Sequence, residues 1–259
     1  MKSIFEFKKS ISILFTDIDD TLTLNGKLNS ESYQALWRLQ EKKIDIIPIT
    51  GRPAGWCEMI ARFWPVKGVI GENGAFYFSH QDGKMKRVYF NSQAASEIHL
   101  KKLKKIKNEI LKKVPGSAVS SDQFCRMHDL AIDFCEDVKP LTKKNIASII
   151  SIFEKHGATA KASSIHINGW FGEFNKLKMA LKFLKNEYSL TSSKKIQDIC
   201  AFVGDSPNDE PMFEYFENSF AVSNIKEFLN QIKNHPNYLS EKKGGLGFSE
   251  IAKVLIKNK

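Results

Sequence analysis

Along the first 75 residues, continuous apolar runs alternate with segments in which apolar residues recur at helical spacing. Three mostly apolar runs with the character of strands lie at 11–15, 44–49 and 69–70. Between them, apolar residues recur at helical spacing over 30–43 and over 59–63. Strands that are separated by helices form parallel βαβ units. This part of the chain therefore predicts a parallel sheet.

The pattern changes between residues 75 and 168. Residues 81–84 are typical of a hairpin turn, and a long lysine-rich helix follows until residues 114–116 break it. A second helix is expected over 141–156, ended by Gly157. Four short extended segments complete the region, at 123–128, 131–135, 158–162 and 164–167. This mixture of helices and short strands predicts an α+β layer.

The alternation of helix and strand returns after residue 168. We expect a helix, a strand, a short helix and a strand at 176–188, 199–203, 210–216 and 219–222. We interpret the glycine-rich residues 244–247 as a turn before a closing helix over 248–256.

Together these patterns predict an α/β fold. We expect a Rossmann-like parallel sheet core with helices on both faces, formed by residues 1–80 and 169–259. Residues 81–168 are expected to form an α+β cap domain that is inserted into this core.

The composition supports a folded protein outside the membrane. The chain has 259 residues, of which 42% are hydrophobic, and no segment approaches the ~20 apolar residues of a membrane helix. The N-terminal segment lacks the apolar stretch of a secretory signal, so we expect a soluble, cytoplasmic protein with no membrane partner. The four cysteines form no C-x-x-C pair, which argues against a zinc site.

The net charge of +10 is concentrated in the predicted insertion. Residues 80–168 hold 16 Lys and Arg against 9 Asp and Glu, a net charge of +7. Many of these lysines lie in the helix that begins after the hairpin, whose apolar residues fall at helical spacing. We interpret its lysines as a solvated face, and no aromatic residues are interleaved with them for nucleic-acid stacking. Nucleic acid is therefore not a favoured partner, whereas the field of a basic domain would attract phosphorylated substrates.

Polar clusters follow three of the predicted strands. They lie at residues 17–21, 50–52 and 205–209. The carboxyl ends of parallel strands meet at one rim of a sheet, which Lys176 could also reach from the first helix after the insertion. Acids as crowded as Asp17 and Asp19 need a counter-charge, and an oxygen-only ligand set suits Mg²⁺.

These clusters carry a resemblance to a known family. Asp17-Ile18-Asp19-Asp20-Thr21 resembles the first motif of the haloacid dehalogenase superfamily, and Thr50-Gly51-Arg52 resembles the second. Lys176 is similar to the third motif and Gly204-Asp205-Ser206-Pro207-Asn208-Asp209 to the fourth. The insertion resembles the α/β cap of subfamily IIB, as does the segment Gly71-Glu72-Asn73-Gly74-Ala75.

The resemblance implies a Mg²⁺-dependent phosphomonoester hydrolase. Asp17 would attack phosphorus and form an aspartyl-phosphate, while Asp19 would act as general acid and base. Thr50 and Lys176 would hold the phosphate oxygens. The metal ligands would be Asp17, the carbonyl of Asp19, Asp205 and, from its own or the next shell, Asp209.

Substrate contacts are expected from both parts of the protein. Core candidates are Gly51, Arg52, Asn73 and Asn208. Candidates at the exits of the insertion and on its inner sheet are Arg126, His128, His166, Asn168 and Trp170. Aromatic faces stack on sugar rings and amides bond hydroxyls, so this set suits a phosphorylated sugar or a related small metabolite. Alternatively, Arg126 pairs with Asp129 or Glu136, while His166 and Trp170 belong to the core.

Some alternatives stay open at this point. Asp20 stands where the superfamily often has glycine, and Lys178 competes with Lys176, from which it lies about 200° around the helix. A phosphomutase of the phosphomannomutase type is the nearest rival function, and a catalytically silent basic binding protein, for instance for RNA, is another. The sequence names neither the substrate nor the oligomeric state.

Overall fold

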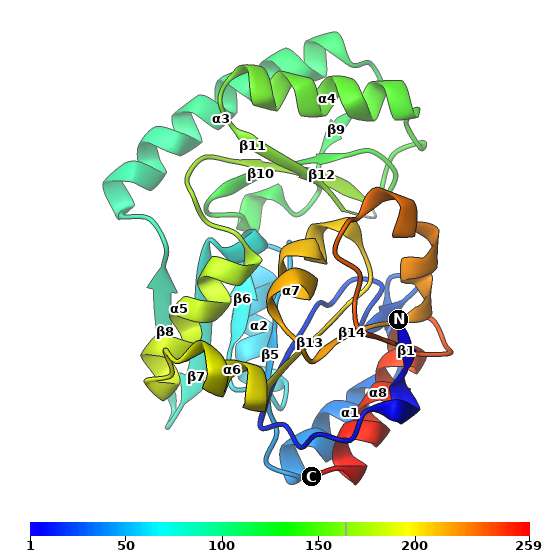
Figure 1. Ribbon diagram of the computed structural model, residues 1–259. Helices are drawn as coiled ribbons and strands as arrows, with labels where there is room; N and C mark the ends of the chain where they lie inside the picture. Colours follow the sequence, from blue (N-terminus) through cyan, green and yellow to red (C-terminus); the bar gives the residue numbers. More distant parts are fainter. Residues whose placement is uncertain (164) are drawn as a thin grey trace.

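A six-stranded parallel sheet forms the centre of the computed structural model, which describes residues 1–163 and 165–259 (Figure 1). Every neighbouring pair of strands in this sheet is parallel. The strand order is β1 (Lys2–Ser3), β15 (Tyr238–Leu239), β14 (Ser219–Ala221), β13 (Cys200–Gly204), β2 (Ile13–Thr16) and β5 (Asp45–Pro48). The two strands that precede the most acidic segments, β2 and β13, are therefore neighbours.

Helices cover both faces of this sheet. One face packs against α1 (Ser30–Glu41), α2 (Ala54–Phe63) and α8 (Gly244–Lys257), the other against α5 (Lys176–Tyr188), α6 (Ser193–Ile199) and α7 (Glu210–Tyr215). Along β2, Leu14 joins the first apolar cluster, whereas Ile13 and Phe15 join the second. A strand buried on both faces has no polar side to alternate with, which explains its nearly continuous apolar sequence. The predicted α/β core is confirmed.

A three-stranded antiparallel sheet extends the core beyond β5. It contains β6 (Val69–Gly71), β7 (Phe76–Gln81) and β8 (Lys84–Tyr89). A parallel bridge between Ile49 and Ile70 connects it to the end of β5. The predicted hairpin turn joins β7 and β8, with positive φ angles at both Asp82 and Gly83.

The inserted cap is a four-stranded antiparallel sheet under two helices. The strand order is β11 (Thr159–Ala162), β12 (His166–Trp170), β10 (Asp129–Asp133) and β9 (Ala118–Val119). Helices α3 (Gln93–Lys113) and α4 (Lys143–Lys155) lie on the side of this sheet away from the core (Figure 1). Leu103 and Ile106 of α3 and Phe153 of α4 are buried in the apolar layer between helices and sheet.

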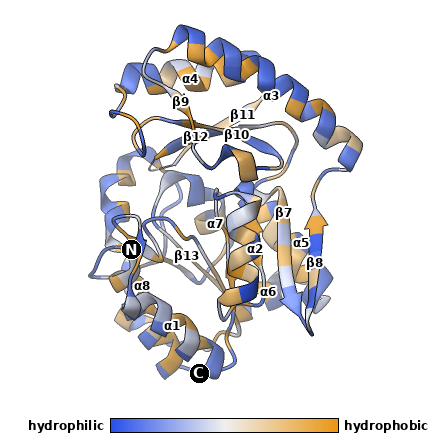
Figure 2. Ribbon diagram, turned by 180° about the vertical axis from the view of Figure 1, so that it is seen from behind, coloured by the Kyte–Doolittle hydropathy of each residue, from blue (hydrophilic) through white to orange (hydrophobic). Residues whose placement is uncertain are grey.

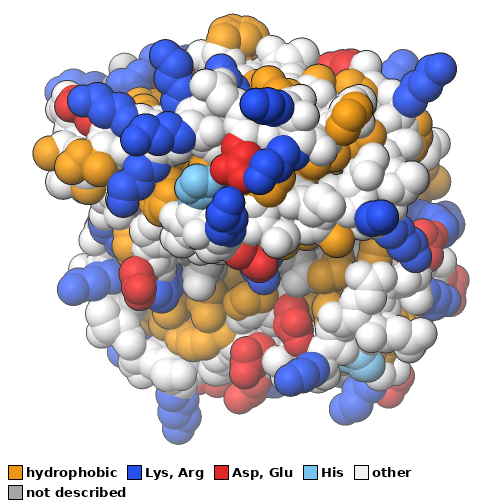
Figure 3. All heavy atoms as spheres, turned by 90° about the horizontal axis from the view of Figure 1, so that it is seen from above, with side chains coloured by type: hydrophobic (Ala, Val, Ile, Leu, Met, Phe, Trp, Pro, Cys, Tyr) orange, Lys and Arg blue, Asp and Glu red, His pale blue; other side chains and the backbone are white. Residues whose placement is uncertain are grey.

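The lysines of α3 are mostly exposed, as the predicted amphipathic pattern requires. Polar and apolar residues are interspersed along α3 and α4 in the hydropathy view (Figure 2). Lysine and arginine side chains are spread over the outer face of the cap, seen from above in Figure 3. Across residues 1–163 and 165–259, no helix combines the length and apolar character that crossing a bilayer requires.

Three local predictions differ from the structure. The strand expected over 123–128 is instead a 3-10 turn, η3 (Gln123–Cys125), followed by an ion-paired segment. The supposed turn at 244–247 is the first turn of α8, and α6 was not predicted at all. At Gly245 an added Cβ would lie 2.6 Å from the carbonyl oxygen of Leu22, so this glycine permits close packing of α8 on the segment after Asp17. The predicted segment 164–167 begins at Ser164, which lies outside the described residues.

The boundaries expected for the cap also need adjustment. A boundary at residue 80/81 would separate β7 from β8, although the two strands pair along their whole length. At the other end, Gly169 and Trp170 belong to β12 of the cap sheet. We therefore propose that the cap comprises residues 92–170 and that the core comprises the rest.

Candidate active site

Asp17 stands at the carboxyl end of the central strand β2. Its backbone N–H donates to the carbonyl of Val203 on β13 at 2.9 Å, and its side chain is buried. Asp205 follows the end of β13, so the pairing of these two strands brings both carboxylates to the same rim. The expected convergence of the first and fourth motifs is thus present in the structure.

Lys176 joins Asp17 to the fourth motif. Its Nζ lies 2.6 Å from Asp17 Oδ1 and 2.6 Å from Asp209 Oδ1. The side chain of Asn175 caps α5 by accepting the N–H of Lys178, which makes Lys176 the first residue of the helix. Lys178 is exposed and lies 3.4 Å from Glu173. The structure therefore places Lys176, and not Lys178, among the acids.

The carboxylates of Asp17, Asp205 and Asp209 form a cluster suited to a divalent cation. All three are buried, and one oxygen from each lies within 4.8 Å of the others. Burial raises the pKa of Asp17 to about 8 although Lys176 opposes the rise, and burial and the charge of Asp17 raise the pKa of Asp205 well above its usual range. When all three acids are ionised, their charge exceeds that of the one lysine, and Mg²⁺, which prefers carboxylate oxygens, would neutralise the excess. The donor set therefore fits the metal expected from the sequence.

Neighbouring side chains orient Asp205. Thr21 Oγ1 donates to its Oδ1 at 3.0 Å, and Asn224 Nδ2 donates to its Oδ2 at 3.0 Å. Asn224 also donates to the carbonyl of Asp20 at 2.9 Å. Asn224 was not among the predicted site residues, because it lies in η5 (Ser223–Glu227), outside every recognised motif.

Asp20 keeps the turn after Asp17 despite replacing the usual glycine. Its φ angle is 58°, in the left-handed region, which aspartate tolerates better than most residues.

Asp19 is turned toward Arg52 of the second motif. Arg52 Nε and Nη2 donate to Asp19 Oδ1 at 3.0 and 2.9 Å. The same guanidinium contacts Glu136 of the cap at 3.3 Å and lies 3.9 Å from Asp122. Arg52 thus links the expected acid/base of the core to two carboxylates of the cap, neither of which was predicted at the site.

Thr50 and Asn73 shape the second-motif loop. Thr50 is fully buried, and its Oγ1 accepts the N–H of Arg52 at 2.9 Å. The N–H of Asn73 donates to the Thr50 carbonyl at 3.0 Å, and the Asn73 amide lies against Gly51, where an added Cβ would approach it to 3.3 Å. Gly51 therefore allows the two loops to pack closely.

A small cavity of about 30 Å³ separates the core from the cap. On the core side it is lined by Asp17, Asp19, Gly51, Arg52, Asp205, Ser206 and Asn208. On the cap side it is lined by Arg126, Ser163, Ile165, His166 and Asn168. This cavity holds no more than about one water molecule, but a neighbouring cavity of about 540 Å³ shares Ser163, Asp205, Ser206 and Asn208 with it.

Two predicted cap residues are committed to contacts within the protein. Arg126 donates to Asp122 and Asp129 and, through Nη1, to the carbonyl of Gly51 at 2.9 Å. The structural ion pair weighed for Arg126 is therefore present, with Asp129 as the partner. Asn168 Nδ2 donates to Asp129 Oδ2 at 2.8 Å.

His166 lines the cavity, and its ring nitrogen Nε2 has no hydrogen-bond partner among the described residues. Its Nε2 lies 2.9 Å from Glu136 Oε2, but the two groups are not aligned as a hydrogen bond. Burial lowers the pKa of His166, which opposes its protonation beside Glu136.

Trp170 and His128 lie outside this cavity. Trp170 is buried and stacks on Phe174 at 5.6 Å, as expected of an anchor, and it lines a separate cavity of about 400 Å³ together with Asn73 and Lys176. His128 packs against Tyr89 at 5.5 Å, and burial lowers its pKa to about 4. The candidate role of His128 in substrate binding is not supported by this position.

Comparisons with known proteins agree with the motifs. The family model of haloacid dehalogenase-like hydrolases matches residues 14–129 and 173–246. No curated protein matches the sequence.

Solved structures share the fold over nearly the whole chain. A Thermoplasma acidophilum protein is 18% identical, with a TM-score of 0.73 over 96% of this chain and 100% of its own. The C-terminal domain of the Candida albicans trehalose-6-phosphate phosphatase is 14% identical, with a TM-score of 0.71 over 98% and 94%. The sucrose-phosphatase from Synechocystis, in complex with sucrose and phosphate, is 16% identical, with a TM-score of 0.63 over 95% and 98%.

Proposed function

We propose that this chain, which belongs to the haloacid dehalogenase-like hydrolase family, is a Mg²⁺-dependent phosphatase of small phosphorylated sugars or related metabolites. The observation that carries the proposal is the buried contact of Lys176 with both Asp17 and Asp209, beside Asp205. A carboxylate held next to a cation and a metal-binding cluster is suited to capture a phosphoryl group.

The reaction would proceed in two displacements. An oxygen of Asp17 forms a bond to phosphorus while the bond to the leaving oxygen breaks, and Asp19 gives that oxygen a proton. A water molecule, deprotonated by Asp19, then attacks the aspartyl-phosphate and releases inorganic phosphate and free Asp17. Lys176 and the N–H groups after Asp17 hold the phosphoryl oxygens. Mg²⁺, bound by Asp17, Asp205 and Asp209 with the Asp19 carbonyl, would neutralise charge on the phosphoryl group.

The nature of the cavity supports a small polar substrate. Its lining is dominated by charged and amide side chains, among them Arg52, His166 and Asn208. A sugar would extend from this small cavity into the adjoining one of about 540 Å³, whose polar lining offers donors and acceptors to hydroxyl groups. Two structural neighbours are named as phosphatases of trehalose 6-phosphate and sucrose phosphate, which supports the same substrate class.

The proposal is tested by measuring phosphate release from a panel of phosphorylated metabolites with Mg²⁺ and without any bisphosphate activator. We expect release from at least one sugar phosphate. Strict dependence on a bisphosphate activator would instead favour a phosphomutase. Salt-sensitive RNA binding without turnover of p-nitrophenyl phosphate would favour a catalytically silent protein.

The Asp17→Asn variant tests the nucleophile. We expect at least ~10³-fold lower kcat, because an amide oxygen is a poor nucleophile toward phosphorus. The fold should persist, since the asparagine side chain has nearly the same shape as aspartate and Lys176 keeps Asp209 as a partner. Near-normal turnover in the folded variant would show that Asp17 is not the nucleophile.

A further inference from the structure

Glu72 is a buried carboxylate that the proposed reaction does not use. It begins η2 (Glu72–Gly74), directly after β6 of the core, and its side chain has no exposed surface. Both Glu72 and Asn73 have positive φ angles, of 44° and 56°. Non-glycine residues adopt this conformation only where surrounding contacts fix it, so the contacts of Glu72 call for an explanation.

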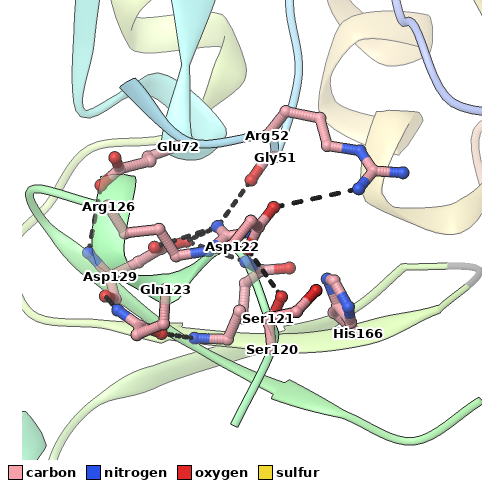
Figure 4. Close-up of polar contacts among 12 residues, drawn as sticks. Gly51, Arg52, Glu72, Ser120, Ser121, Asp122, Gln123, Arg126, Asp129 and His166 are labelled. Carbon is pink, nitrogen blue, oxygen red and sulfur yellow. Dashed lines mark hydrogen bonds and ion pairs between the residues drawn. The ribbon is translucent and has the colours of Figure 1, made fainter. Parts of the chain in front are cut away.

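The Glu72 carboxylate accepts four backbone N–H groups from two parts of the protein. One oxygen accepts Ala54 of α2 at 3.2 Å and Met127 at 2.8 Å. The other accepts His128 at 2.6 Å and Asp129 at 3.2 Å. Three consecutive amides of the cap are therefore bound by one side chain of the core, whose carboxylate points toward the segment that leads to Asp129 (Figure 4).

These contacts oppose the cost of burying the charge. Burial and the charge of Asp129 raise the pKa of Glu72 to about 8, and the N–H donors from Met127 and His128 limit this rise by stabilising the ionised form. Hydrogen bonds to an ionised acceptor are shorter and stronger than those between neutral groups. Separating the cap from the core at this point would leave the carboxylate and three amides without these partners.

The segment held by Glu72 leads directly into the cavity. Arg126, one residue before the bound amides, reaches back to the Gly51 carbonyl and lines the cavity. Asp129, the last of the bound residues, accepts both Arg126 and Asn168, and Asn168 lines the cavity as well. Glu72 itself does not touch the cavity, so any effect on substrate must pass through these residues.

We propose that Glu72 is a positioning residue that adds an attachment between core and cap to the chain connections and to the contacts of Arg52 and Arg126, and thereby holds Arg126 and Asn168 over the phosphoryl site. The consequence for binding rests on the proposed phosphatase function, whereas the attachment itself does not. Glu72 fixes the edge of the cap at Met127–Asp129. This edge determines the positions of Arg126 and Asn168, which would contact the leaving group of the substrate.

Hydrogen exchange on the wild-type protein and on Glu72→Gln tests the attachment. In the wild type, the amides of Met127, His128 and Asp129 should exchange as slowly as those of the core strands. In Glu72→Gln, which loses charge and half of the acceptor capacity, their exchange should become at least ~10-fold faster. Fast exchange of these amides in the wild type would overturn the proposal, even if the variant fails to fold.

Asp133→Asn provides a matched control. Asp133 is also buried and also accepts three backbone N–H groups, but all three belong to the cap, at Cys135, Glu136 and Asp137. Its loss should accelerate exchange at 135–137 and leave 127–129 protected. Equal acceleration at 127–129 in both variants would overturn the proposal, because general loosening of the cap would then explain the result.

Enzyme kinetics separate positioning from a merely structural role. With p-nitrophenyl phosphate as substrate and glucose 6-phosphate as competitor, Glu72→Gln should raise the inhibition constant of glucose 6-phosphate ~5-fold, while kcat for the aryl phosphate changes less than ~2-fold. If affinity for glucose 6-phosphate and kcat for the aryl phosphate fell by the same factor, the role in positioning would be overturned. If neither compound is turned over or bound, the proposed function fails, and hydrogen exchange still decides the attachment.

Discussion

At the residue scale, the site depends on one lysine among three buried acids. Asp17, Asp205 and Asp209 come from two neighbouring strand ends, and Lys176 reaches two of them from the start of α5. Burying like charges together is costly, so each acid depends on the cations nearby. The role of Lys176 is therefore both structural and chemical.

Replacing Lys176 by methionine should reveal both roles. We expect kcat to fall at least ~10²-fold, since a charge that stabilises the phosphoryl oxygens is lost. We also expect a loss of about 3 kcal/mol in the free energy of unfolding without metal, since Asp17 and Asp209 lose their buried partner. Urea unfolding and phosphate release measure the two effects.

Lys178→Met is the matched control for this experiment. Lys178 is two positions away and exposed, so its loss should change the free energy of unfolding by less than ~0.5 kcal/mol and leave kcat unaltered. If the Lys178 variant were the inactive one, the assignment of the third motif would be wrong.

At the scale of elements, short segments at strand ends and turns determine how the layers meet. Gly245 lets the first turn of α8 approach the Leu22 carbonyl, and η3 replaces a predicted strand at the contact between cap and core. The loop before β10 also carries His128, which lies against Phe76 and Tyr89 of the hairpin. Burial in this contact lowers the pKa of His128 to about 4.

This pKa predicts a loss of stability in acid. Because the unfolded chain protonates near pH 6.5, His128 contributes stability above that pH that is lost as the pH falls toward 4, by about 3 kcal/mol in all. Between pH 7.5 and 5, the wild type should therefore lose about 2 kcal/mol more than His128→Asn does.

Urea unfolding at the two pH values measures this difference. The exposed His235 provides a control, because His235→Asn should keep the pH dependence of the wild type. An unchanged dependence in His128→Asn would show that the buried imidazole is not the source.

At the scale of the whole molecule, positive charge lies on the outer surface of the cap and acidic residues lie in the interior, between cap and core. The outer helices of the cap carry exposed lysines (Figure 3). The rim beneath the cap holds the buried acids of the core. A basic exterior favours the approach of phosphorylated substrates, and an acidic interior retains a cation. Metal and substrate are thus expected to act together at one site between core and cap.

Removal of Mg²⁺ tests this arrangement. A chelator should abolish phosphate release, and added Mg²⁺ should restore it. Saturating Mg²⁺ should also raise the stability of the wild type by about 2.7 kcal/mol at one hundred times its Kd, measured by thermal unfolding.

In Asp205→Asn the stabilisation by Mg²⁺ should largely disappear, because one buried ligand loses its charge. The metal site would be contradicted if Mg²⁺ stabilised this variant as much as the wild type. Activity that survives the chelator would contradict it as well. Asp198 lies outside the acidic cluster, so Asp198→Asn is the control. Mg²⁺ should stabilise this variant as much as the wild type.

The sequence by itself determined the layered core and the convergence of its motifs. Apolar runs buried on both faces, helices between them and polar residues at strand ends are local patterns, and parallel pairing brings those ends to one rim. Lys176 was recognised from its place in the order of motifs, and its contact with Asp17 follows from the start of α5.

Only the tertiary structure decided what closes the site. Asn224, Glu136 and the amides bound by Glu72 act through partners far away in the sequence, and no local pattern records such distances. The same holds for Arg126. An arginine can bind substrate or form an ion pair within the protein, and only its contact with Asp129 in the folded structure distinguishes the two. Periodicity reports which side of an element is buried, whereas the partner across a domain contact depends on how separately folded layers meet.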